Sequence, residues 1–445
     1  MSTISSTSTG ESFAAPRLYR NRNYLWWLAT DSSTAFGAAV HGFSVPLLAL
    51  YVTGSPAQAG LIAGIGQLGR VLTTIPGGVI ADRHNRRTLM VVGGVAGLVI
   101  GSALTAFQLA GLLGFWLLTV LNLLMNMRNG FFGSVSNAAL KQVVSAAQVG
   151  PAMAANQGRD AVIALSGGPV AGILMGVGRA VPFAATALSH AAGTIAALMI
   201  HVDLRPGGPA AVGGAAGGGI AAARGPVRSF VDDAVLGIKW LMGRTELRGI
   251  IILSTILNLG INSALTAVIF GLQQRGESPA AIGLVSAGIG VGMLLGSFIA
   301  GPLVKRLGAG TIVIAGLVVM TASLLVLPFV TALPAVMLIQ SLAIFSAPAI
   351  NAALLGYFMV AVPTELLGRA TSAMDLMSMG AMPLSPLVAG FGYALLGWTG
   401  ILLVCAGICV LTTVLAWANG GLRTLPSSDH WAAHAAAVTE GTPRP

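Results

Sequence analysis

The stretch 78-GVIADRHNRRTLM-90 concentrates charge in a chain that otherwise avoids it. Four charged residues fall within six positions here: Asp82, Arg83, Arg86 and Arg87. Only 8% of the 445 residues are charged, whereas a typical soluble domain has about 25%. Because hydrophobic residues make up 55% of the chain, we expect most of its surface to face lipid rather than water.

Long apolar runs surround this cluster, and each is long enough to cross a bilayer as a helix, which takes about 20 residues. The predicted spans are 24–51, 57–80, 88–110, 112–138, 156–178, 182–202, 247–271, 280–304, 310–330, 332–359, 369–396 and 398–420. A β-barrel would show short alternating segments instead. The sequence therefore predicts an all-α integral membrane protein with twelve transmembrane helices.

The basic residues are distributed unevenly between the two sides of these spans. Nineteen Lys and Arg residues, Arg159 among them, fall on the side that carries both termini, and only Arg179 and Arg275 fall on the other. This positive-inside bias predicts cytoplasmic termini and a cytoplasmic 78–90 loop in the inner (plasma) membrane. It also accounts for the net charge of +10, so no nucleic-acid partner is expected.

The chain divides near its middle at a low-complexity stretch, PGGPAAVGGAAGGGIAAARGP, residues 206–226. We predict an N-terminal tail (1–23), a six-helix bundle (24–205), a cytoplasmic linker with an amphipathic helix (206–246), a second six-helix bundle (247–421) and a C-terminal tail (422–445). Shifting the opening stretch by 223 residues places it on 301-GPLVKRLGAGTIV-313, with several identities. This echo supports two duplicated halves.

The opening stretch resembles the loop 2–3 signature of the major facilitator superfamily, G-x-x-x-D-R-x-G-R-R. The matching residues are Gly78, Asp82, Arg83, Arg86 and Arg87. Asn85 replaces the expected glycine, and we expect the change to be mild because Asn also adopts left-handed backbone angles. The resemblance implies the major facilitator fold, with two pseudo-symmetric six-helix bundles, and transport rather than enzymatic activity.

Further segments resemble particular branches of that superfamily. The stretch 168-GPVAG-172, with Gly168, Pro169 and Gly172, resembles the Gly-Pro motif of the antiporter branch. Arg128 in 126-NMRNGFFGS-134 resembles the buried arginine of the span 4 motif. The segments 128–157 and 232–253 resemble the branch that contains macrolide-efflux and enterobactin-exporter proteins.

Four side chains inside the predicted spans are candidates for proton coupling, because an ionisable group in a bilayer is costly and usually functional. Asp31 is the first candidate for the proton carrier; its alternative role is an interfacial ion pair or a helix cap. His41 lies about 80° further around the same helix and could border the same cavity, or serve as a packing residue. Asp375 is the second candidate carrier, or a partner of the charge cluster.

Arg128 completes this group, since a guanidinium group stays charged. It could hold an anionic part of the substrate or stabilise a carboxylate such as Asp31. Arg70, near the inner end of its span, is expected to extend to the membrane interface rather than form a site.

Polar and thioether side chains are candidates for lining a substrate cavity, although they can equally hold helices together. The asparagines recur at helical spacing on two spans, and methionines suit varied apolar ligands. The candidates are Asn122, Asn126, Asn129, Asn258, Asn262, Met377 and Met382.

Two sets of residues are expected to control the conformational cycle. By resemblance, Asp82 lies near the start of span 11, and the arginines of the cluster can meet Asp160 at the cytoplasmic mouth, so these residues would form a cytoplasmic gate. The Gly168–Pro169 pair is either a hinge or seal, or a static kink.

The combined prediction is an exporter of a small amphipathic or apolar molecule that works by proton antiport and alternating access. Import by proton symport is the alternative, and a membrane enzyme or sensor is a remote one. The energy source is the proton gradient, and we expect no cofactor and no metal, since Cys405 and Cys409 offer too few ligands. The expected partners are the small-molecule substrate and the bilayer, with the protein acting as a monomer.

Overall fold

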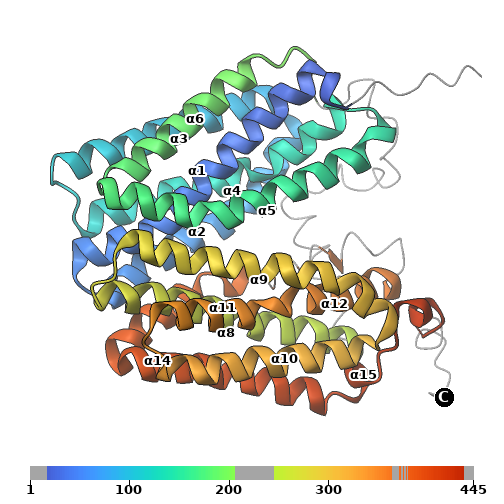
Figure 1. The fold of residues 1–445 in the computed structure, drawn as a ribbon. Coiled ribbons are helices and arrows are strands. Elements are labelled where there is room, and N and C mark those ends of the chain that lie inside the picture. The colour runs from blue at the N-terminus through green and yellow to red at the C-terminus, as the bar shows by residue number, and fades with distance from the viewer. Residues whose placement is uncertain are drawn as a thin grey trace, which may run out of the picture.

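The computed structural model describes residues 18–205, 245–362 and 379–434, together with residues 370, 371, 374 and 377 (Figure 1). Within these residues the regular secondary structure is helical, and no strand occurs. Several predicted features lie outside the described residues: most of the N-terminal tail, the linker with its amphipathic helix, Asp375 and the end of the C-terminal tail.

Six long helices form the N-terminal half, which occupies the upper part of Figure 1. They are α1 (Arg22–Thr53), α2 (Pro56–Arg83), α3 (Arg86–Leu109), α4 (Phe115–Val143), α5 (Ala146–Val177) and α6 (Val181–Leu198). Local signals set their ends: the Asn21 side chain accepts the first free N–H groups of α1, and Gly54 ends that helix with a φ of 64°. Short connections then force neighbouring helices to run antiparallel.

The C-terminal half occupies the lower part of Figure 1. Its helices are α8 (Thr245–Gln274), α9 (Pro279–Arg306), α10 (Ala309–Val326), α11 (Leu333–Phe345), α12 (Ala347–Ala361), α14 (Leu384–Ala418) and α15 (Gly420–Arg423). The segment α14 contains two helices joined at Gly397, whose φ of 66° and ψ of −169° reverse the chain. Gly397 lies between the predicted spans 369–396 and 398–420.

Nine helical segments of the described chain are long and apolar enough to cross a membrane, the last of them being 379–418, which contains the Gly397 reversal. Helices α2 and α4 are equally long but contain Arg70, Arg128 and several amide side chains. Adding these two helices and counting 379–418 as two spans gives the twelve predicted ones. The all-α, multi-pass prediction is confirmed.

The duplication expected from the sequence is visible in the helix boundaries. Adding 223 to the bounds of α2 (Pro56–Arg83) gives the bounds of α9 (Pro279–Arg306). The same shift carries the start of α3 at Arg86 onto the start of α10 at Ala309. The echo between residues 78–90 and 301–313 therefore marks equivalent helix–loop–helix corners.

The two ends of the molecule differ in charge and in contacts. We call the end with residues 83–87, 143–146 and 305–309 the basic end, and the end with residues 53–56, 177–181 and 274–279 the opposite end. The halves touch mainly where α5 meets α9 and where α2 meets α14, and α5 and α9 lie side by side in Figure 1. These contacts lie toward the opposite end.

Glycines allow this close approach. A Cβ atom at Gly283 of α9 would lie 2.6 Å from the carbonyl oxygen of Gly168, and one at Gly168 would lie 2.7 Å from Cβ of Ser286. Gly60 and Gly390 face each other in the same way across the α2–α14 contact. Small residues bring helices together in membranes, where the hydrophobic effect between helices is weak.

Candidate functional site

A charged cavity of about 380 Å³ lies inside the N-terminal half. We call it the arginine cavity, because Arg70 of α2, Arg128 of α4 and Arg159 of α5 all line it. Its other lining residues are Thr30, Asp31, Thr34, Ala35, Ala38, Met90, Gly93, Asn129, Phe132, Gly133, Ser136, Asn137 and Asp160. Five helices thus contribute side chains to one polar space.

Asp31 of α1 forms an ion pair with Arg159 of α5, with 2.5 Å between Oδ2 and Nη2. The two side chains are 17% and 15% exposed, so the pair is largely shielded from solvent. Arg159 also bonds the neighbouring Asp160, at 2.7 Å. Asp31 therefore pairs with Arg159 rather than with Arg128, the partner considered from the sequence.

The position of Arg159 differs from the one inferred from hydropathy. The predicted span began at residue 156, which left Arg159 at the cytoplasmic edge, whereas α5 begins at Ala146. A capping box formed by Ser145 and Gln148 starts the helix there. Arg159 consequently lies well inside α5, where it can reach α1.

Arg128 is 7% exposed and is held in place by two hydrogen bonds. Its Nε donates to the carbonyl oxygen of Gly93 at 2.7 Å, and its Nη1 donates to Oδ1 of Asn129 at 2.9 Å. It forms no ion pair with any carboxylate among the described residues. The guanidinium group is thus oriented by neutral acceptors, with further N–H groups remaining.

Arg70 does not extend to the membrane interface as the sequence analysis expected. Its side chain lines the arginine cavity and also a second cavity, between the two halves. It forms no hydrogen bond or ion pair through its guanidinium group with any described residue. A polar cavity solvates the charge, so the side chain has no need to reach the lipid headgroups.

The second cavity, of about 270 Å³, lies between the halves, and we call it the central cavity. It shares Ala38, Arg70 and Asn129 with the arginine cavity, so the two spaces adjoin. Its remaining lining residues are His41, Gly42, Val45, Pro46, Ala63, Gln67, Asn122, Asn126, Asn262, Thr266, Ile269, Met382, Ser385 and Pro386. Five of the seven predicted cavity residues are therefore placed here.

His41 and Asn122 belong to a buried polar network beside the central cavity. Nε2 of His41 lies 3.2 Å from Oδ1 of Asn122, whose Nδ2 donates to the carbonyl oxygen of Ile62 at 2.9 Å. Nδ2 of Asn126 in turn donates to Oδ1 of Asn122 at 3.0 Å. Asp31 and His41 thus line adjoining cavities rather than one shared wall.

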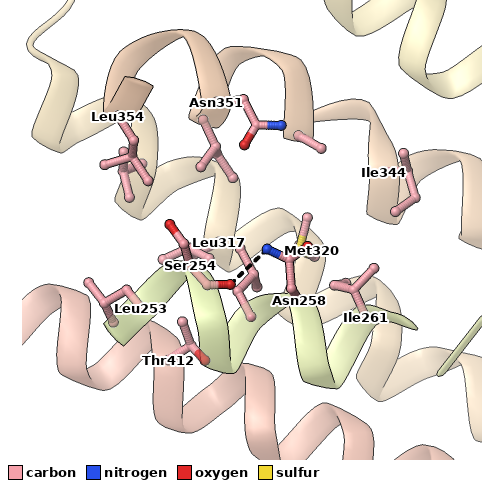
Figure 2. A pocket seen from close by; sticks show the side chains of 14 residues that line it. Leu253, Ser254, Asn258, Ile261, Leu317, Met320, Ile344, Asn351, Leu354 and Thr412 are labelled. Carbon is pink, nitrogen blue, oxygen red and sulfur yellow. Dashed lines mark hydrogen bonds between the residues drawn. The ribbon is translucent and has the colours of Figure 1, made fainter. Parts of the chain in front are cut away.

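A third, smaller space of about 90 Å³ opens along α8 in the C-terminal half (Figure 2). Asn258 lines it together with Leu253, Leu317, Met320, Ile344 and Leu354, so we call it the apolar pocket. Nδ2 of Asn258 donates to the carbonyl oxygen of Ser254 at 2.8 Å, the bond dashed in Figure 2. Asn262, one helical turn further along α8, lines the central cavity, whereas Met377 packs against the nearby hydrophobic core.

Of the predicted gate residues, Asp82 and Arg83 are exposed at the basic end, and Arg86 and Arg87 are half-buried there. Asp82, in the last turn of α2, makes no hydrogen bond or ion pair with a described residue. A Cβ atom at Gly78 would meet nothing within 4 Å, and Asp160 pairs with Arg159 rather than with Arg83, Arg86 or Arg87. In this conformation the predicted gate contacts are not formed among the described residues.

Asn85, which replaces the glycine of the signature, does not use a left-handed backbone. Its φ is −60°, and its side chain accepts the N–H of Arg87 at 3.0 Å as the N-cap of α3. The expected reason for tolerance was wrong, because this corner needs a capping side chain and not a positive φ.

The Gly-Pro motif lies where the halves touch. Pro169 lies inside α5, and Gly168 and Gly172 face α9 at Gly283. At the same end, Nε2 of Gln273 on α8 donates to the carbonyl oxygen of Leu47 on α1, at 2.8 Å. The motif therefore forms part of a closed contact between the halves.

Sequence reasoning missed three residues: one that lines the arginine cavity, one buried histidine and one at the contact between the halves. Arg159 was counted at the cytoplasmic edge of its span, and the S-x-x-Q capping signal at Ser145 was the clue to its place well inside a helix. His190 of α6 is fully buried, with neither ring nitrogen bonded to a described residue. Gln273 carries no distinguishing sequence signal, because an amide near a helix end is common.

Comparisons with known proteins agree with this architecture. Among solved structures, a mutant nucleoside transporter is similar, with a TM-score of 0.67 and 12% identity over 89% of this chain and 100% of its own. A D-xylose-proton symporter has a TM-score of 0.63 and 16% identity, over 91% and 98%. A bacterial homologue of the iron transporter ferroportin, in an inward-facing state, has a TM-score of 0.64 and 16% identity, over 91% and 99%.

These structural likenesses show the fold alone. Among curated proteins, no sequence matches this chain significantly. The family profile described as Major Facilitator Superfamily matches residues 32–275 and 250–436, which together span nearly all of the two helical halves. The chain therefore belongs to the Major Facilitator Superfamily.

Proposed function

We propose that this protein exports a small amphipathic molecule by proton antiport, with alternating access to a site between its halves. The observation that carries the proposal is the Asp31–Arg159 ion pair inside the arginine cavity. A carboxylate at such a place can take up a proton and release its arginine partner, which couples protonation to the arrangement of α1 and α5. We further propose the inner membrane as the location.

The distribution of contacts supports a direction for this conformation. The contacts between the halves lie toward the opposite end, at Gly168–Gly283 and at Leu47–Gln273. If the basic end faces the cytoplasm, as the positive-inside bias favours, this is an inward-facing state.

Asp31 and Arg128 would then divide the coupling task. Asp31 exchanges the proton, and Arg128 supplies a fixed positive charge in the same cavity. Asp375, which lies outside the described residues, stays a candidate for a second carrier.

Everted membrane vesicles that hold an acid interior, reported by a pH-sensitive dye, test this function. We expect compounds that are substrates to dissipate the gradient when they are added outside, because export into the vesicle releases protons. Asp31→Asn should abolish this response, whereas Asp203→Asn, a matched change at an exposed carboxylate, should preserve it. A substrate response that persists in Asp31→Asn would contradict the proposed carrier.

Import by proton symport is the alternative and makes the opposite prediction. It would use the same carboxylates, so the site alone does not separate the two directions. Right-side-out vesicles would then take up protons when the substrate is added outside. Everted vesicles would show no dissipation on addition of that compound.

A further inference from the structure

The charges that line the arginine cavity and the central cavity do not balance. Among the described lining residues there are three arginines, Arg70, Arg128 and Arg159, and two aspartates, Asp31 and Asp160. Both aspartates contact Arg159. Arg70 and Arg128 therefore face the cavities without a carboxylate partner among the described residues.

Arg128 is the more buried of these two cations and is already oriented. Its bonds to Gly93 and Asn129 fix the plane of the guanidinium group, and both acceptors are neutral. A shielded cation that has only neutral partners is unfavourable compared with one that meets an anion. The fork of the guanidinium group also matches the geometry of a carboxylate or phosphate.

Arg70 supplies the second cation, and its side chain is not held in place as that of Arg128 is. It lines both cavities, and no described side chain holds its guanidinium group. It can therefore turn toward a ligand in either space. A fixed cation beside an adaptable one, in a cavity rich in Asn side chains, is suited to an anionic oxygen group.

The surroundings on the C-terminal side are suited to the rest of such a molecule. The central cavity is bordered there by Ile269, Met382 and Pro386. The apolar pocket opens one helical turn away along α8, and Leu317, Ile344 and Leu354 surround it (Figure 2). An apolar part can thus face α8 while a charged group lies against α2 and α4.

We propose that the transported molecule is an amphipathic anion, whose carboxylate or similar group binds between Arg70 and Arg128. This inference rests on the proposed transport function and narrows its substrate class. An entering anion would also compete with Asp31 for the positive charge of the cavity. Substrate binding and proton binding would then be linked through one electrostatic environment.

Binding of two matched compounds tests the charge requirement. The full-length protein is placed in phosphatidylcholine nanodiscs, and binding of 1-naphthoate and of neutral 1-naphthamide is measured by equilibrium dialysis, with empty nanodiscs as the blank. We expect naphthoate to bind at least about tenfold more tightly, which corresponds to about 1.4 kcal/mol. Equal binding of the two compounds would overturn the proposal.

Two variants locate the effect. Arg70→Gln should remove most of the preference for naphthoate and leave naphthamide binding within about twofold. Arg205→Gln, which removes an equal charge from a side chain that is 75% exposed at the basic end, should change neither affinity. A loss in Arg70→Gln that is equal for both compounds would refute charge recognition and indicate a packing role.

The vesicle assay separates this inference from the proposed function. If cationic compounds alone drive proton release, in wild type and in Arg70→Gln alike, transport stands and the anion proposal fails. If naphthoate binding depends on Arg70 but no compound moves protons, the anion site is supported and proton antiport fails.

Discussion

Adding one methyl group at Gly283 should drive the protein out of the conformation described here. The Cβ atom of Gly283→Ala would lie 2.6 Å from the carbonyl oxygen of Gly168 and 3.1 Å from Cα of Pro169. Both neighbours are backbone atoms, so no side-chain rotation can relieve the overlap. Helices α5 and α9 must separate by several tenths of an ångström before the contact becomes an ordinary one.

The size of the effect follows from the cost of overpacking. Inserting a carbon atom into a close contact typically costs about 1–3 kcal/mol. The cost applies only while α5 and α9 are in contact, because a state in which these helices part has room for the methyl group. The population of that state should therefore rise by roughly 5–150-fold relative to wild type.

Accessibility of a cysteine at position 175 reports on this equilibrium. Met175 lies on α5 and lines the small space between the halves at the opposite end, where it is 6% exposed. In Met175→Cys protein, the rate of reaction with a polar maleimide should rise in proportion to the open population. The native Cys405 and Cys409 are fully buried and should contribute little labelling.

Gly176→Ala provides the matched control on α5. A Cβ atom there would meet nothing within 4 Å, so the same chemical change should leave the labelling rate as it was. Thermal unfolding of each variant distinguishes opening from loss of the fold. Equal labelling rates in the Gly283→Ala and Gly176→Ala backgrounds would refute the argument that the glycine contact holds this end closed.

Three further changes have clear expected outcomes. Asp31→Asn should abolish substrate-driven proton release in everted vesicles while the protein still reaches the membrane, as measured by dye quenching and immunoblotting; a retained response would exclude Asp31 as an essential carrier. Asp82→Asn should reduce the transport rate, because Asp82 is predicted to belong to the cytoplasmic gate. The amount of protein in the membrane should stay normal, because Asp82 bonds no described residue in this conformation. A normal transport rate would exclude Asp82 from the gate. Gly397→Ala should lower the free energy of unfolding by about 1–3 kcal/mol, and with it the unfolding temperature, since a φ of 66° with a ψ of −169° suits glycine alone. Gly407→Ala, in a regular helix, should leave the unfolding temperature unchanged. Equal stability of the two variants would contradict this interpretation of the turn.

Hydropathy and spacing were sufficient for the fold because a bilayer leaves few alternatives. Each backbone polar group must be satisfied within its own segment, so long apolar runs become helices. The reversal at Gly397 was located because a chain with two adjoining spans needs a turn between them. The repeat was detectable because the duplicated corner kept residues of the same type at equivalent places.

The charged site was less predictable, because pairing depends on where helices begin and which faces meet. A hydropathy boundary placed Arg159 at the membrane edge, whereas the helix starts at Ala146 and brings it to Asp31. Arg70 was assigned to the interface because a sequence does not reveal a polar cavity next to it. Candidate residue types were therefore identifiable, but their partners were not.

The two copies of the charged corner differ at the trailing arginines, because Arg86 and Arg87 correspond to Ala309 and Gly310, whereas Arg83 corresponds to Arg306. In the N-terminal half, the N–H of Arg86 donates to the carbonyl oxygen of Leu204, in the chain that follows α6. In the C-terminal half, the equivalent N–H of Ala309 donates to the carbonyl oxygen of Pro426, in the chain that follows α14. The same backbone contact therefore closes both halves after their sixth span.

The side chains at these corners differ because the returning chain approaches them differently. Arg87 extends from its corner and donates through Nη2 to the carbonyl oxygen of Leu198, at 2.5 Å. A Cβ atom at Gly310, its counterpart, would instead collide with the carbonyl oxygens of Leu422 and Arg423. Close packing of the C-terminal segment thus excludes a large residue at position 310, so the asymmetry of the charge cluster follows from packing as well as from any role in a gate.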